Sequence, residues 1–380
     1  MYALKIYFYF FVEIYSNVCY NFFKTVVNFY AVNLNAQRRF DKEDFFLKAY
    51  NAKDIRNIAI AGHGGRGKTT LAEAMLYTAK ATDRLGRVAD GTTVLDFDAE
   101  EKKRKATVST AVAAIEWNGA KINILDTPGL FDFAGGMSEG IRAADSVLIV
   151  TAAGSGFDVG AEKALKAANA RGISRMFAIT RCDADNTDFY KTFTAIKDAV
   201  GGAICPVIVP YMDGGKVAAY VNLASRKAFD YSSGEKKEVA LPSDPQLDEM
   251  LDILTEAVAS SDDELMEKFF AGETFTREEI IKALNSGVSD GSVIPVYACA
   301  GYTCEAIDML LDEIVYSAPS AADKAGENGL PCDENGPLAA ICFKTIADPF
   351  VGKMSFFKVV SGKITSDTPA YNSRTEESER

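Results

Sequence analysis

The sequence feature that most constrains the fold is the stretch Gly62-His63-Gly64-Gly65-Arg66-Gly67-Lys68-Thr69. It fits the phosphate-loop pattern of Gly, four free positions, Gly, Lys, then Ser or Thr. Residues 57–61, Asn-Ile-Ala-Ile-Ala, predict a short buried strand that enters the loop, and Leu71, Ala74, Met75 and Thr78 recur afterwards at helical spacing. Strand, glycine loop and helix together favour a cradle for nucleotide phosphates, because the loop N–H groups and the helix N-terminus face the same anion.

Within this cradle, Lys68 is expected to reach the β- and γ-phosphates and the Thr69 hydroxyl to bind Mg²⁺. The alternative is a glycine-rich turn that happens to precede a helix, and the matching flanks favour the cradle. The residues expected to contact the nucleotide here are Gly62, His63, Gly64, Gly65, Arg66, Gly67, Lys68, Thr69 and Thr70.

Composition limits the possible partners. A chain of 380 residues with 48% hydrophobic and 25% charged residues can bury the cores of two or three domains. Its net charge of -12 argues against DNA as a partner and against coating nucleic acid through bulk positive charge, so RNA would have to meet a local basic patch. Seven cysteines without a Cys-x-x-Cys pair predict reduced thiols in a cytoplasmic protein rather than a disulfide framework or a zinc site.

The first 46 residues differ from the rest of the chain. They are crowded with Tyr, Phe, Asn, Val and Ile, but Lys5, Glu13 and Lys24 interrupt every apolar run long enough to cross a membrane. No small-residue cleavage site follows the apolar part, which argues against a signal peptide. Residues 1–46 are therefore an aromatic, disordered extension or a non-native leader translated from upstream of the true start, and the second interpretation is favoured.

A charge run at residues 96–105 leads into Thr107 and then into a predicted hairpin. Such a run is usually a solvated face. Residues 108–117 and 120–125 read as strands on either side of an Asn118-Gly119 turn. A strand pair placed between a phosphate loop and the next acidic residue favours the GTPase branch of phosphate-loop proteins.

The second strand of this hairpin ends at Asp126-Thr127-Pro128-Gly129. This places a carboxylate and a glycine at the carboxyl edge of the sheet, where ligands of open α/β folds bind. Asp126 is expected to hold Mg²⁺ through water, the Gly129 amide to sense the γ-phosphate, and Thr107 to complete the metal shell from a mobile segment. Loss of the γ-phosphate would release both Thr107 and Gly129, which describes a switch. The alternative is that these four residues form a common turn.

Strands and helices continue to alternate along the chain. Strands are predicted at 147–150 and 176–179, and helices at 159–170 and 188–200 that end at Gly172 and Gly201. The pattern predicts an α/β domain with a doubly wound, mostly parallel sheet.

These residues together resemble the translational GTPases, and most closely elongation factor G and its bacterial elongation-factor-G-like relatives. The matching motifs are Gly-His-x-x-x-Gly-Lys-Thr-Thr from Gly62, Arg104 with Thr107, Asp-Thr-Pro-Gly-x-x-Asp-Phe from Asp126 to Phe133, the Thr180-Arg181-Cys182-Asp183 stretch, and residues 263–269 and 344–352. The likeness runs from about Lys48 to the end of the chain.

The resemblance implies a phosphate-loop NTPase fold and a domain plan. Residues 47–320 would form the GTP-binding domain, 321–336 a linker, and 337–380 a truncated β-barrel domain II whose first strands lie at 338–346 and 354–360. The family's remaining domains are absent, so a fragment is expected. Residues 47–51 resemble the start of elongation-factor-G-like proteins with Leu47 in place of Met, and Leu47 is the expected native start because Leu can be encoded by UUG.

The resemblance also implies an inserted α+β subdomain at about 208–283. Residue patterns agree with it: strands are predicted at 226–231 and 236–241 around a Ser233-Gly234 turn, and helices at 247–259 and 262–270. Thr276 and Glu279 form a predicted capping box at the start of another helix. A strand at 293–298 then returns to the parent sheet, and 306–316 forms the last helix.

Several residues depart from the family pattern. The base-reading motif Asn-Lys-x-Asp appears as Thr180-Arg181-Cys182-Asp183, where Asp183 keeps the contact to two guanine donors but Thr180 is too short to replace an Asn amide. The neighbouring Ser-Ala pair appears as Ala300-Gly301, which removes a hydroxyl but leaves backbone amides. The base-contacting candidates are therefore Thr180, Arg181, Asp183, Ala300 and Gly301.

Departures also occur near the γ-phosphate. Gly64 and Gly65 replace an aliphatic residue and an Asp, which would remove an apolar wall and open access for water. Leu130 replaces the His that positions the attacking water. The single histidine, His63, is expected to be a packing or capping residue rather than a base.

The sequence thus predicts a protein that binds GTP, GDP and Mg²⁺ and acts with the ribosome in the cytoplasm, without a membrane or DNA partner. Lys68 and Gly129 are the residues expected to stabilise the transferring phosphoryl group. Two functions remain open: a GTPase, with slow hydrolysis expected, and a nucleotide-gated ribosome-binding protein with little or no hydrolysis. An ATPase is a third and weaker option because Asp183 is retained.

Overall fold

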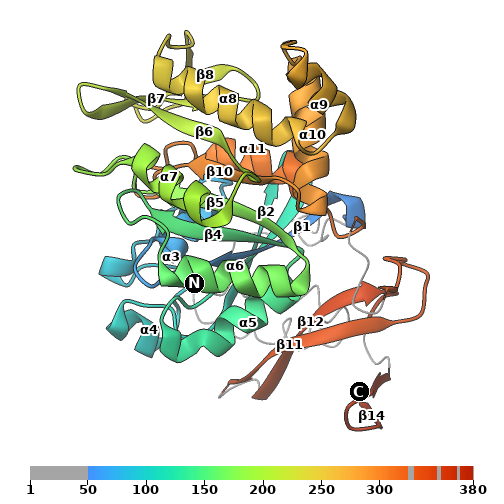
Figure 1. The fold of residues 1–380 in the computed structure, drawn as a ribbon. Helices are drawn as coiled ribbons and strands as arrows, with labels where there is room; N and C mark the ends of the chain where they lie inside the picture. The colour runs from blue at the N-terminus through green and yellow to red at the C-terminus, as the bar shows by residue number, and fades with distance from the viewer. Residues whose placement is uncertain (1–49, 324–328, 349–351, 366–368, 380) are drawn as a thin grey trace, which may run out of the picture. The chain divides into compact units, whose positions relative to one another are not determined.

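A single ten-stranded sheet organises the N-terminal unit of the computed structural model (Figure 1). The structure describes residues 50–323, 329–348, 352–365 and 369–379. The strand order is β2-β3-β1-β4-β5-β10-β6-β7-β8-β9. In chain order the strands are β1 (Ile55–Ala61), β2 (Ala111–Trp117), β3 (Ala120–Asp126), β4 (Ser146–Ala152), β5 (Ser174–Thr180), β6 (Ile204–Asp213), β7 (Lys216–Asn222), β8 (Lys227–Asp230), β9 (Lys237–Val239) and β10 (Ile294–Ala298).

The middle of this sheet is parallel. β3, β1, β4, β5, β10 and β6 run in the same direction as their neighbours, and β2 pairs with β3 in the antiparallel sense. The chain leaves β1 toward β3 on one side and later adds β4 on the other, so the carboxyl end of β1 is the point where the order reverses. The predicted doubly wound, mostly parallel α/β fold is confirmed.

Helices cover both faces of the sheet. The helices α5, α6 and α7 pack on one face, while α3, α10 and α11 contact the strands and one another on the other (Figure 1). No helix in the described part of the chain is both long and apolar enough to span a bilayer. The bounds are α3 (Lys68–Thr78), α4 (Ala99–Arg104), α5 (Ala134–Ala143), α6 (Val159–Arg171), α7 (Phe189–Val200), α8 (Pro245–Ala259), α9 (Asp263–Phe270), α10 (Arg277–Asp290) and α11 (Ile307–Ser317).

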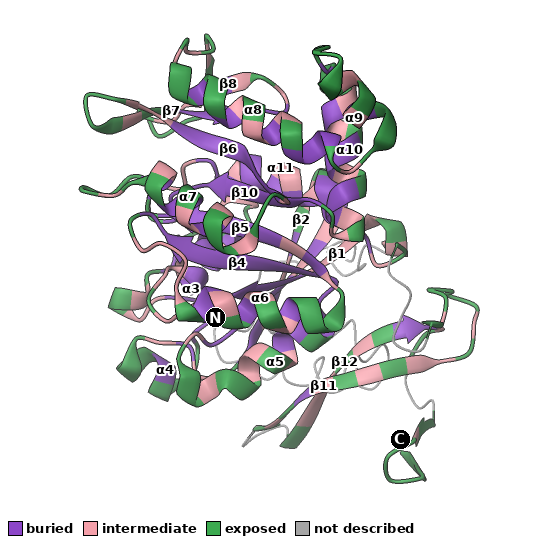
Figure 2. Ribbon diagram, viewed as in Figure 1, coloured by how far each residue is buried: buried purple, intermediate pink, exposed green. Residues whose placement is uncertain are grey.

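The core lies between the sheet and these helices. All seven residues of β4 are buried, as a strand covered on both faces requires (Figure 2). Phe177, Phe193, Tyr220 and Tyr297 are among the largest side chains that are fully buried.

The segment expected to be an insert extends the parent sheet rather than forming a sheet of its own. β7, β8 and β9 follow β6 as an antiparallel meander. β8 and β9 match the strands predicted around the Ser233-Gly234 turn, and α8 and α9 match the predicted helices. The capping box at the start of α10 is confirmed, since the Thr276 side chain accepts from the Glu279 N–H and the Glu279 side chain accepts from the Thr276 N–H.

Small sheets follow the main unit. β11 (Ala339–Asp348) and β12 (Gly352–Ser361) form one two-stranded sheet, and β13 (Ala370–Asn372) and β14 (Glu377–Glu379) form another. They fit a partial β-barrel and include the two strands predicted there. The expectations for residues 1–46 and for a start at Leu47 lie outside the described residues.

The charge run at 96–105 is more than a solvated face, because it contains the helix α4. Asp98 caps this helix in a capping box with Glu101, and three basic residues occupy the last turn. Glu101 is only 2% exposed and accepts hydrogen bonds from the N–H groups of Val108 and Ser109, at 3.0 and 3.2 Å. The helix therefore fixes the chain on either side of Thr107.

A buried carboxylate on α3 holds the segment that leads to this helix. Glu73 is fully buried, and its Oε1 accepts from the N–H groups of Val94 and Leu95 at 2.7 and 2.9 Å. Burial raises the pKa of Glu73 to about 7, although these backbone hydrogen bonds oppose the shift. The phosphate-loop helix and the segment before Thr107 are thus joined through one side chain.

We predict that Glu73→Ala releases this segment while the sheet stays folded. One part-buried and one buried N–H group would lose their acceptor, so the Val94 and Leu95 amides should exchange with solvent about tenfold faster or more. Hydrogen exchange measured by mass spectrometry tests this. Glu73→Gln, which keeps an acceptor oxygen, and Glu100→Ala, at an exposed surface ion pair, should leave exchange near the wild-type rate. Equal exchange in all three variants would contradict the anchoring role.

Candidate nucleotide site

The phosphate loop joins β1 to α3 and depends on glycine at several positions. Gly62, Gly65 and Gly67 have φ angles of 134°, 75° and 91°, a region that other residues rarely adopt. Gly67 caps the N-terminus of α3, and a Cβ at Gly62 would overlap the Val150 carbonyl oxygen. The loop therefore brings its backbone close to β4 and leaves the N-terminus of α3 facing the site, as an anion cradle requires.

Lys68 lies at the centre of the cradle. It is 6% exposed, and its ammonium group donates to the His63 carbonyl at 2.9 Å. Burial lowers the pKa of Lys68, while Asp126, Asp158 and Asp96 oppose the shift. The Gly129 backbone lies directly against it, because a Cβ at Gly129 would overlap the Lys68 ammonium group. The two residues expected to stabilise a transferring phosphoryl group are thus neighbours.

The hydroxyl groups of the two expected metal ligands meet in this site. Thr69 Oγ1 and Thr107 Oγ1 are 2.9 Å apart, and both side chains are buried. Adjacent ligands of an octahedral Mg²⁺, each at about 2.0 to 2.1 Å, lie roughly 2.9 Å from each other. The spacing of the two hydroxyls therefore fits one edge of a magnesium coordination shell.

Asp126 supplies an unsatisfied negative charge beside these hydroxyls. It is fully buried, neither carboxylate oxygen has a hydrogen-bond partner, and burial raises its pKa to about 7 against the effect of Thr69 and Lys68. Among the described residues, no group of three or more His, Cys, Asp or Glu side chains could hold a metal alone. The donor set of hydroxyls and one carboxylate fits Mg²⁺, which keeps waters and takes phosphate oxygens as its other ligands.

Sequence reasoning missed a further carboxylate here. Asp96 is 2% exposed; its Oδ1 accepts from the Thr107 hydroxyl at 2.8 Å, and its Oδ2 has no partner. Burial raises the pKa of Asp96 to about 6. A position within a charge run does not indicate that Asp96 contacts Thr107. This contact exists only once Glu73 and Glu101 have fixed the segment on either side.

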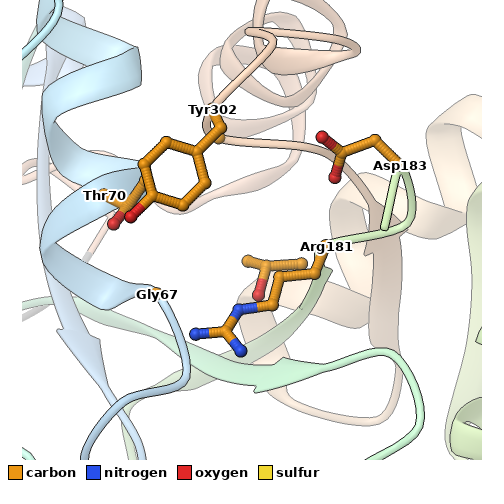
Figure 3. Close-up of a pocket in the computed structure, with 7 residues that line it drawn as sticks. Gly67, Thr70, Arg181, Asp183 and Tyr302 are labelled. Carbon is orange, nitrogen blue, oxygen red and sulfur yellow. The ribbon is translucent and has the colours of Figure 1, made fainter. Parts of the chain in front are cut away.

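A small pocket, partly open to solvent, lies beside the start of α3 (Figure 3). Figure 3 shows the Tyr302 ring and the Arg181 side chain on either side of its opening, with the Asp183 carboxylate at one end. A planar base could stack between these two side chains and meet the carboxylate with its edge. The pocket is lined by Gly67, Thr70, Thr180, Arg181, Asp183, Gly301 and Tyr302.

Two side chains tie this pocket to the phosphate loop. The Thr180 hydroxyl donates to the Arg66 carbonyl at 2.8 Å, and an Arg181 terminal nitrogen donates to the Gly65 carbonyl at 2.6 Å. Arg66 also pairs with Asp158 at 2.8 Å. Thr180 therefore uses its hydroxyl on the loop backbone, while Asp183 is exposed at the pocket.

Ala300, one of the expected base contacts, does not line this pocket. Ala300 is fully buried, and its N–H donates to the Glu305 carbonyl at 3.0 Å. Its amide is thus engaged within the loop, and the pocket reaches Gly301 and Tyr302 instead. The contribution of Tyr302 was not foreseen, because an exposed tyrosine in a loop carries no local signal.

The apolar wall lost at Gly64 is replaced from another element. Leu130, 41% exposed, places its Cδ2 2.9 Å from where a Cβ of Gly64 would lie. The expected opening for water at this position is therefore filled by the leucine side chain, whereas nothing lies within 4 Å of a Cβ at Gly65.

His63 packs against neighbouring residues of the domain. Its ring meets Phe131 edge-on at 5.4 Å between centroids, and Lys163 lies 3.8 Å above the Phe131 ring. Its Nδ1 is buried without a hydrogen-bond partner, and the backbone of His63 lies against Gly160 of α6. These contacts agree with the packing role expected from the sequence.

Comparison with known proteins adds to this geometry. The sequence profile described as "Elongation factor Tu GTP binding domain" matches residues 53–320. An elongation factor G-like protein of Mycobacterium tuberculosis, strain CDC 1551 / Oshkosh, is 34% identical over 332 residues, which cover 83% of this chain and 46% of that protein. The protein of the same name from strain ATCC 25618 / H37Rv gives the same values.

A solved structure is similar as well. A crystal structure of a protein from Thermus thermophilus matches with a TM-score of 0.74 and 34% identity, covering 82% of this chain and 46% of that one. The chain thus spans less than half the length of these relatives. Since the profile covers most of the chain and contains the whole candidate site, the chain belongs to the translational GTPase family.

Proposed function

We propose that this protein is a translation-factor-like GTPase that binds GTP with Mg²⁺, hydrolyses it slowly, and cycles between two states on the ribosome in the cytoplasm. The observation that carries the proposal is the 2.9 Å contact between the Thr69 and Thr107 hydroxyls beside the unpaired Asp126 carboxylate. Because the chain spans less than half of its relatives, the ribosome and the activity of a longer protein are part of this proposal.

In this proposal the metal is held by the hydroxyls of Thr69 and Thr107 and, through water, by Asp126. Bound Mg²⁺ would neutralise charge on the phosphate oxygens. Thr69 belongs to α3, whereas Thr107 belongs to the segment fastened by Glu73 and Glu101. Release of Thr107 would therefore open the site without moving the helix, which is how a switch segment acts.

The groups that stabilise the phosphoryl group are independent of any water-positioning side chain. The Lys68 ammonium and the backbone N–H of Gly129 would face the γ-phosphate and hold its developing charge. Leu130, one residue further, offers neither a donor nor an acceptor and covers Gly64. We therefore infer that binding is intact and that hydrolysis is slow.

A second function is favoured by the same leucine. A site that binds GTP but neither orients nor readily admits the attacking water would act as a nucleotide-gated ribosome-binding protein with little or no turnover. The two functions differ only in the rate of hydrolysis, so kinetics separate them.

The first prediction from the proposed function concerns base selection. GTP and GDP should bind in a Mg²⁺-dependent manner and ATP more weakly, because adenine would leave the Asp183 carboxylate without its two donors, at a cost of about 1 to 3 kcal/mol. Competition against a fluorescent GDP analogue measures this. ATP that displaces the analogue as well as GTP does would contradict guanine selection.

The second prediction concerns the metal. Thr107→Val should weaken binding of a non-hydrolysable GTP analogue about tenfold or more and leave GDP binding unchanged, because in the proposed cycle only the triphosphate holds Thr107 at the metal. Titration over a range of Mg²⁺ concentrations, with EDTA as the metal-free reference, gives the affinities. Thr92→Val, in the same segment, is the matched control; equal losses for both nucleotides would rule out a switch role for Thr107.

The third prediction concerns hydrolysis. Leu130→His should raise the single-turnover rate of the full-length protein on ribosomes by about a hundredfold or more, with little change in GTP affinity, because it restores a group that can hold water. Leu130→Ala serves as control, since it removes the apolar cover without adding a donor. A wild-type rate equal to that of an ordinary elongation factor, or an alanine variant as fast as the histidine variant, would overturn this account of the site.

A further inference from the structure

The strands β7, β8 and β9 form an antiparallel extension of the parallel sheet. A buried tyrosine of this extension contacts residues 300–306, a loop that borders the pocket beside α3, which we call the base pocket. Tyr220 lies on β7, between β6 and β8, and is only 1% exposed. Its hydroxyl donates to the Glu305 Oε2 at 3.0 Å. Burial raises the pKa of Tyr220 well above its usual value, so the group remains a donor.

Glu305 anchors the loop formed by residues 300–306. Its carbonyl accepts from the Ala300 N–H at 3.0 Å and closes the loop across its base. Cys304 and Ala306, on either side of it, have φ angles of 60° and 59°, in the left-handed region that these residue types rarely occupy. A loop with two such residues keeps its conformation only when outside contacts define it. Tyr220 supplies one of these contacts from another part of the sheet.

This loop meets the base pocket at two points. Gly301 and Tyr302 line the pocket directly. Thr303 donates its hydroxyl to the Asp183 Oδ2 at 3.4 Å, so the loop also touches the carboxylate expected to read the base edge. A shift of Glu305 would therefore move both the stacking face and the partner of Asp183.

We propose that Tyr220 is a positioning residue for guanine recognition, acting through Glu305 on residues 300–306 and on Asp183. The inference rests on the proposed guanine binding and deepens it. It makes the antiparallel extension a structural support of base selection, although none of its residues lines the pocket.

A neighbouring contact provides the matched control. Tyr231 donates its hydroxyl to the Asp308 Oδ1 at 2.6 Å, and its ring packs edge-on against Tyr220 at 5.8 Å. Asp308 belongs to α11 and lies beyond the loop that closes at Glu305. Tyr231→Phe therefore removes a comparable buried hydrogen bond without removing a contact of residues 300–306.

The experiment measures the affinities of the full chain for GDP and for inosine diphosphate, which lacks the exocyclic amino group that Asp183 would accept from. Tyr220→Phe removes only the hydroxyl and should weaken GDP binding about three- to tenfold, with a smaller effect on inosine diphosphate. The ratio of the two affinities should then fall toward one. Glu305→Gln keeps an acceptor for the tyrosine and should hold the ratio near its wild-type value, as should Tyr231→Phe.

Each outcome decides a separate question. A Tyr220→Phe variant that weakens both nucleotides equally, or neither, overturns the positioning role. Glu305→Ala breaks the same contact from its half-buried end and should reproduce the fall in the ratio if Tyr220→Phe does not fold. A wild-type protein that fails to bind GDP, or binds inosine diphosphate equally well, would instead overturn the proposed guanine binding itself.

Discussion

The contact between the Thr69 and Thr107 hydroxyls is the interaction on which the rest of the site depends. It joins the first turn of α3 to a segment that has no strand or long helix of its own, at a distance that fits two ligands of one metal ion. Three buried carboxylates keep that segment in place: Glu73 holds its start, Asp96 accepts from Thr107 itself, and Glu101 holds the residues that follow. Burying such groups is unfavourable unless each has partners, so the segment and the helix are defined together.

The phosphate loop is also held by side chains that line the pocket beside α3. Thr180 and Arg181 hydrogen-bond two consecutive carbonyl groups of the phosphate loop, at Arg66 and Gly65. Arg181 does this from a left-handed conformation, with φ of 61°. A small movement of the loop that carries Asp183 would therefore shift the backbone of the phosphate loop through these hydrogen bonds. In the function we propose, this makes recognition of the base and of the phosphates one event rather than two.

The sequence predicts those parts of the fold and site that depend on local chemistry. The phosphate loop, the Asn118-Gly119 hairpin and the capping box at Thr276 each depend on residues that are close together in the sequence, and all three are present in the structure. The sequence does not predict the helix α5, because its glycines disfavour a helix in isolation. They are required by packing instead: side chains at Gly136 and Gly140 would collide with Pro128 and Thr127. Asp96, Tyr302 and the engaged amide of Ala300 likewise follow from contacts between distant segments, which spacing along the chain does not encode.

The geometry also separates binding from hydrolysis. In the function we propose, backbone amides and buried side chains would hold the phosphates and the metal, while exposed side chains at the pocket, Arg181 and Asp183 among them, would meet the base. The position that would orient an attacking water is residue 130, whose partly exposed side chain lies beside Gly64 of the phosphate loop. Gly64 and Leu130 illustrate this, since the smaller residue in the loop leaves the space that the larger one fills. The two positions therefore have to be considered as a pair: a bulkier residue at Gly64 would displace the Leu130 side chain, and a polar group at 130 would have room to reach the γ-phosphate because Gly64 has no side chain.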